Sequence, residues 1–133
     1  MSPHTHVTST STSATPVPVK VWAAFADLDR QYVTASARMP MTTDTEQAAR
    51  AACLALISAR RAGWWRVLKR WTDRDPGLHP VYGEAVIAAL YAERGNARFW
   101  RQSAADWAAR ANGDRHGSGL WATWDHLDGG AVA

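Results

Sequence analysis

Apolar side chains recur three and four residues apart along most of this chain, which is the spacing of one face of an α-helix. Residues 18–37 carry the first such stripe, formed by Val21, Phe25, Leu28 and Tyr32 with Trp22 at its edge. No segment shows the alternation of apolar and polar residues that a half-buried strand requires. Alanine, which favours helix, contributes 26 of the 133 residues. The pattern therefore predicts an all-α fold.

A second, longer helix is predicted from Thr43 to about residue 72. Thr43 and Glu46 have the spacing of a capping box, Ser/Thr-x-x-Glu, and TDRDPG at 72–77 contains the Pro and Gly that end helices. Gly63 is expected to bend this helix or split it. Its predicted buried stripe comprises Ala49, Cys53, Leu56, Ile57, Trp64, Val67, Leu68 and Trp71.

Further helices are predicted in the second half of the chain, each bounded by a glycine. One runs from Pro80 to Arg94, with Gly95 after its end, and is our candidate for the central helix. Another begins at Asn96 as N-cap and ends before Gly113. GDRHGSG is then expected to be a loop, and LWATWDHL, residues 120–127, a last short helix.

These elements predict a small helical bundle of about four helices plus a short C-terminal helix. Residues 1–16, with nine Ser or Thr, are predicted to be a disordered tail. Residues 17–112 form the bundle, and residues 113–133 form a loop and short helix that pack on it. A chain of this length supports one domain.

The segment RRAGWWRVLKRW, residues 60–71, contains five basic residues and three tryptophans. If Trp64 faces the core, Trp65 is expected to face outward on a ridge with Arg61 and Lys69. Basic residues also concentrate at 94–110. The candidate binding residues are Arg61, Trp65, Arg66, Lys69, Arg70, Arg94, Arg98 and Arg101.

Such a surface would attract phosphates, and an exposed Trp65 would stack on an unpaired base. The sequence thus indicates a nucleic-acid-binding or regulatory accessory protein that contacts DNA or RNA. The alternative is a protein–protein interaction module for an acidic partner. Two other interpretations stay open: a solvated back of a core helix, with Trp65 stacked on a neighbour or covered by the C-terminal segment, and a membrane-surface contact. A helix-turn-helix around ERGNA, residues 93–97, matches only in general pattern.

The sequence offers little for catalysis, and we expect no enzyme activity, metal or cofactor. The one polar cluster with suitable chemistry runs from His116 to Asp128, and its spacing fits no zinc site. Cys53, the only cysteine, is expected to be a small buried residue. No apolar run is long enough to span a membrane and no secretory signal is evident, so the expected compartment is the cytoplasm. We identify no resemblance to a known family.

Overall fold

A computed structural model of the chain describes residues 14–37 and 43–128, with side chains placed as far as residue 113. Its regular elements are the helices α1 (Val17–Ser36), α2 (Asp44–Asp73) and α3 (Pro80–Asp128). The described residues contain no strand, which confirms the predicted all-α class. The predicted tail lies outside the described residues except for its last three positions.

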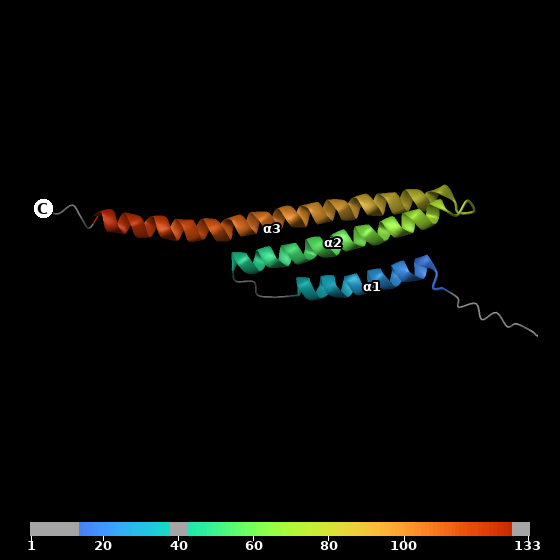
Figure 1. The fold of residues 1–133 in the computed structure, drawn as a ribbon, viewed down its shortest axis with the longest axis horizontal. Coiled ribbons are helices and arrows are strands. Elements are labelled where there is room, and N and C mark those ends of the chain that lie inside the picture. The colour runs from blue at the N-terminus through green and yellow to red at the C-terminus, as the bar shows by residue number, and fades with distance from the viewer. Residues whose placement is uncertain (1–13, 38–42, 129–133) are drawn as a thin grey trace, which may run out of the picture.

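The three helices lie side by side, with α2 in the middle (Figure 1). α2 and α3 form an antiparallel hairpin, and α1 packs on α2 alone. Within the described residues, no Cα atom of α1 lies within 8 Å of a Cα atom of α3. The prediction that residues 80–94 form the central helix is therefore wrong, because α2 contacts both other helices.

The start of α2 follows the predicted capping box. The Thr43 side chain accepts a hydrogen bond of 3.1 Å from the backbone N–H of Glu46 and so satisfies one of the free donors of the first turn. α2 then continues without interruption through Gly63 to Asp73. The possible split at Gly63 does not occur.

The turn between α2 and α3 is held by two side chains. Asp75 Oδ1 accepts a hydrogen bond of 2.9 Å from the Gly77 N–H. His79 Nδ1 accepts one of 3.2 Å from the Val81 N–H, so His79 caps the first turn of α3. Hydrogen bonds of this kind, between a side chain and a backbone N–H two residues later, fix where one helix ends and the next begins.

α3 is one continuous helix of 49 residues, so the prediction of separate helices that end and begin at Gly95 and Asn96 is wrong. One stripe of buried or half-buried residues passes through this region at alternating spacings of three and four. Because the stripe keeps its phase, a continuous helix can pack all of these residues against α2. This packing outweighs the roughly 1 kcal/mol by which an interior glycine destabilises a helix. The stripe consists of Gly83, Val86, Leu90, Glu93, Ala97, Trp100, Ala104, Trp107 and Ala111.

The continuity of α3 also contradicts two other predictions, the helix-turn-helix and the separate C-terminal helix. There is no turn at ERGNA, so the helix-turn-helix is excluded there. The expected loop at 113–119 and short helix at 120–127 belong to the same helix, which extends past the N-terminal end of α2 (Figure 1). The result is fewer, longer helices than predicted.

The core lies where α2 meets both neighbours. Leu28 and Ala35 of α1 pack with Leu54 and Ile57 of α2, and the half-buried Tyr32, Trp64 and Trp100 pack against them. The predicted stripe on α2 is rotated from the real one, since Leu56 is 52% exposed and Cys53, expected to be buried, is also exposed. Small residues instead occupy much of the contact face, which lets the neighbouring helices approach closely. The buried residues of α2 are Ala51, Leu54, Ala55, Ile57, Ser58 and Ala62.

Candidate functional site

Five of the eight predicted binding residues are exposed, two on α2 and three on α3. Arg66 and Arg70 are one helical turn apart, and they point away from the arc of α2 that faces the other helices. The three on α3 fall within about 60° of one another around the helix axis. We call the five residues the arginine band: Arg66, Arg70, Arg94, Arg98 and Arg101.

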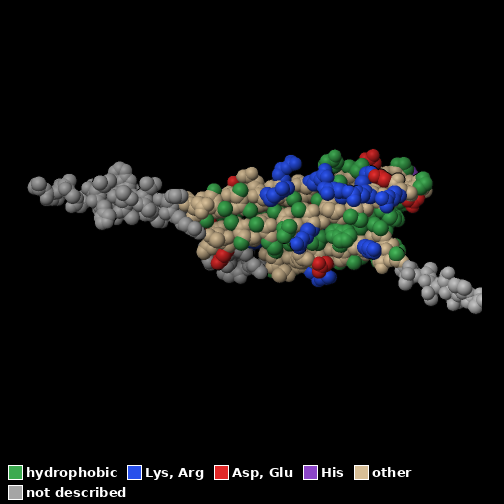
Figure 2. Space-filling view, in the orientation of Figure 1, with side chains coloured by type: hydrophobic (Ala, Val, Ile, Leu, Met, Phe, Trp, Pro, Cys, Tyr) green, Lys and Arg blue, Asp and Glu red, His purple; other side chains and the backbone are tan. Residues whose placement is uncertain are grey.

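The hairpin brings the two parts of the arginine band together. Arg61 Nη1 lies 3.6 Å from Glu93 Oε1, which places these positions of α2 and α3 level with each other. With this antiparallel register and a rise of 1.5 Å per residue, the band extends roughly 25 Å from Arg70 to Arg101. Figure 2 shows a band of Lys and Arg side chains over the adjoining sides of α2 and α3.

The charges of the arginine band are not neutralised by neighbours. No carboxylate among the described residues forms an ion pair with any of the five. The Arg94 guanidinium carbon lies 5.8 Å from the centroid of the Tyr91 ring. Arg101 Nε donates to the Ala97 carbonyl oxygen at 3.3 Å. These contacts orient two of the guanidinium groups while leaving the positive charge of the band uncompensated.

The other three predicted residues do not form an outward ridge, so this part of the prediction is wrong. Trp65 is half-buried, and its ring centroid is 4.7 Å from that of Phe25 on α1. Arg61 is 23% exposed and forms ion pairs with Asp29 and Glu93. Lys69 is half-buried and pairs with Asp73, one turn further along α2. The three do share one side of α2, but that side faces inward.

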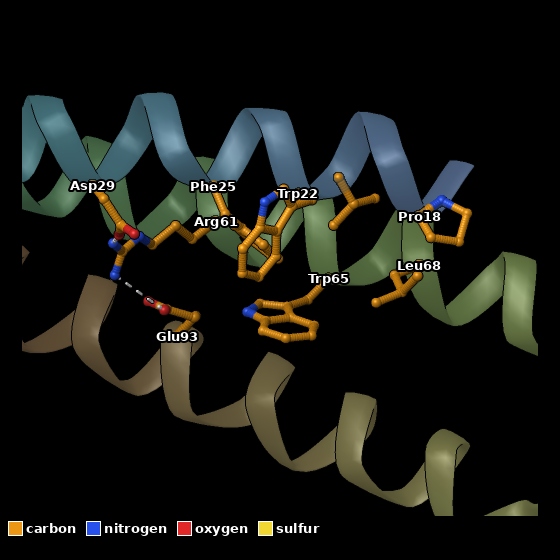
Figure 3. A pocket seen from close by; sticks show the side chains of 9 residues that line it. Pro18, Trp22, Phe25, Asp29, Arg61, Trp65, Leu68 and Glu93 are labelled. Carbon is orange, nitrogen blue, oxygen red and sulfur yellow. Dashed lines mark ion pairs between the residues drawn. The ribbon is translucent and has the colours of Figure 1, made fainter. Parts of the chain in front are cut away.

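A pocket of about 490 Å³ lies between the three helices on this inward side (Figure 3). Trp22 and Phe25 of α1 and Trp65 of α2 form its aromatic walls, and one end is lined by charged residues. We call it the aromatic pocket. Its lining residues are Pro18, Val21, Trp22, Phe25, Asp29, Arg61, Trp65, Leu68 and Glu93.

The charged end joins all three helices through one guanidinium. Arg61 of α2 lies between Asp29 of α1 and Glu93 of α3 and forms an ion pair with each (Figure 3). Arg61 also lies over the ring of Tyr32, 5.8 Å from its centroid. Glu93 Oε2 and Arg61 Nε are buried and have no hydrogen-bond partner. This end of the pocket thus holds two carboxylates, one guanidinium and unsatisfied polar atoms.

Sequence reasoning missed the aromatic pocket because its walls come from three helices whose packing it did not predict. One signal was available: Glu93 continues the apolar stripe of α3, and a charged residue at such a position needs a partner from another helix. Trp22 gave a second signal, because it is an aromatic residue at the edge of the apolar stripe of α1. It is 77% exposed beside the pocket.

Other chemistry is sparse in the described part of the chain. There, no group of three or more His, Cys, Asp or Glu side chains is placed to hold a metal ion. None of the described helices is both long and apolar enough to cross a membrane. Asp27 pairs with Arg30 while Asp29 pairs with Arg61, so these carboxylates face different sides of α1. The predicted polar cluster from His116 to Asp128 lies beyond residue 113, so its side chains are not among those that the structure describes.

The geometry leaves two candidate sites, the arginine band and the aromatic pocket. Comparison with known proteins does not choose between them or add a third. No protein-family model, curated protein or solved structure matches this chain.

Proposed function

We propose that this chain is a non-catalytic nucleic-acid-binding protein of the cytoplasm that contacts DNA or RNA through the arginine band. The observation that carries the proposal is the alignment of five exposed arginines, none paired with a described carboxylate, on adjacent antiparallel helices over roughly 25 Å. Guanidinium groups bind phosphate oxygens in a bidentate manner. A row of this length suits several consecutive phosphates of one strand.

Binding through such a row is expected to depend on the phosphate backbone and not on the base sequence. Trp65, the predicted stacking residue, is half-buried against Phe25. An exposed aromatic residue that contacts the band is Tyr91, which is 64% exposed and lies beneath Arg94. Affinity is therefore expected to come mainly from released counterions.

The test is fluorescence anisotropy of labelled single-stranded and duplex DNA and RNA across a salt series. We expect affinity to fall steeply with salt, because each phosphate contact adds about 0.9 to the slope of log affinity against log salt for duplex DNA. Changing Arg94, Arg98 and Arg101 to Gln should lower that slope by about 3 and weaken binding by at least about tenfold.

A matched control changes Lys20, Arg60 and Arg110 to Gln. This variant loses the same total charge from exposed positions outside the arginine band. If the two triple variants lose affinity equally, net charge and not the band governs binding. If the unaltered protein binds no nucleic acid even at low salt, the proposal is wrong.

One observation favours the second candidate, an acidic protein partner. Exposed apolar side chains occur on the same two helices as the band, since Leu56 is 52% exposed on α2 and Phe99 is 62% exposed on α3. Protein partners use such side chains, whereas a phosphate backbone does not. Stronger binding of poly-glutamate than of DNA in the same assay would favour this candidate.

A further inference from the structure

The aromatic pocket has the dimensions and lining of a small-molecule site. Its volume of about 490 Å³ lies within the usual range of roughly 300–1,000 Å³. Most of its wall is apolar or aromatic, and its polar groups converge at the end formed by Asp29, Arg61 and Glu93. An apolar chamber with a few polar groups at one end binds ligands with an apolar body and a polar head.

The polar end carries an unmet negative charge. Its two carboxylates, from Asp29 and Glu93, face a single guanidinium, from Arg61. Glu93 is the more buried acid, with a side chain 15% exposed. Its Oε1 is paired with Arg61, but its Oε2 is buried without a hydrogen-bond donor. Arg61 Nε is also unpartnered, yet the Arg61 charge is already balanced by two acids.

We propose that the aromatic pocket binds an organic cation with a flat apolar body and an amidinium, guanidinium or ammonium head. The head pairs with the Glu93 carboxylate at the polar end of the pocket and supplies the missing positive charge. The body lies among the rings of Trp22, Phe25 and Trp65, whose negative faces attract cations. The ligand is either a free small molecule or an arginine side chain, next to an aromatic one, on a partner protein.

This proposal is independent of the proposed function. None of the five arginine-band residues lines the aromatic pocket. Charge removal from the band is therefore expected to leave cation binding unchanged, so failure of one proposal is distinguishable from failure of the other.

The test is a titration followed by NMR of the indole N–H signals, with those of Trp22 and Trp65 assigned through Phe variants. The probes are benzamidine, a planar cation, its neutral analogue benzamide and its anionic analogue benzoate. We expect benzamidine to shift both signals in a saturable manner, in the millimolar range usual for so small a ligand. Benzamide and benzoate should bind at least about tenfold more weakly.

Variants locate the head and the body of the ligand. Glu93→Gln should weaken benzamidine binding at least about tenfold and leave benzamide binding unchanged. Trp22→Ala should also weaken benzamidine binding, and it should leave the fold intact because Trp22 is 77% exposed. Tyr82→Ala, which removes another exposed aromatic residue from outside the pocket, is the matched control.

Equal binding of the cationic, neutral and anionic probes would overturn the proposal, as would benzamidine binding that Trp22→Ala does not weaken. Absence of any saturable shift with benzamidine would do the same. A parallel titration with acetyl-phenylalanyl-arginine amide separates the two sources of ligand. Tighter binding of the peptide assigns the pocket to a partner protein, and tighter binding of benzamidine assigns it to a free small molecule.

Discussion

Trp64 and Trp65 are neighbours in the sequence, and both face other helices. A helix with one buried stripe would have to expose one of them. α2 is contacted by α1 and by α3, so its buried arc is wide enough for both side chains. Trp64 packs against the core cluster, and Trp65 packs against Phe25. The prediction of an outward ridge depends on a narrow buried face, which cannot hold two adjacent side chains.

The burial of these rings predicts different costs of truncation. Trp65→Ala should lower the free energy of unfolding by about 2–3 kcal/mol, because it removes a half-buried ring and its contact with Phe25. Trp22→Ala should change it by less than about 0.5 kcal/mol, because that ring is 77% exposed. Urea denaturation of both variants measures the difference. Equal effects would contradict the orientation of Trp65.

At the scale of the element, α3 shows which sequence signals were informative. Gly95 and Asn96 resemble a helix stop followed by a start, which is what the sequence predicts there. The alternating spacing of buried residues runs through them without a change of phase, from Leu90 to Ala97 and on to Trp100. A true break would shift that phase, because a turn changes the direction of the chain. Continuity of the stripe was therefore the better guide.

A substitution at Gly95 distinguishes a helix interior from a helix end. A Cβ added to Gly95 would meet nothing within 4 Å, and the position lies inside α3. Gly95→Ala should therefore raise the free energy of unfolding by about 0.5–1 kcal/mol. At a helix end with positive φ, the same change would be destabilising. Thermal or urea denaturation gives the sign, and a loss of stability would contradict the continuous helix.

For the whole molecule, the sequence predicts the helical class, the limits of the first two helices and the cap at Thr43. These features depend on residues close together in the chain. The order of the helices in space depends on contacts between distant residues, such as Arg61 with Asp29 and Glu93. For that reason the sequence could point to single residues of the aromatic pocket, such as Glu93, but not to the pocket itself. The exposure of the band arginines was predictable, because the exposure of each depends on its position around a single helix.

The attachment of α1 to α2 alone has a consequence for motion. α1 can detach without breaking any backbone contact to α3, whereas the α2–α3 hairpin would stay paired. Local opening should therefore cost less than global unfolding, and amide hydrogens of α1 should exchange faster than those in the paired part of the hairpin. Native-state hydrogen exchange measures this, and equal protection would show that the three helices open together. Because α1 supplies five of the nine residues that line the aromatic pocket, each such opening would also admit or release whatever occupies it.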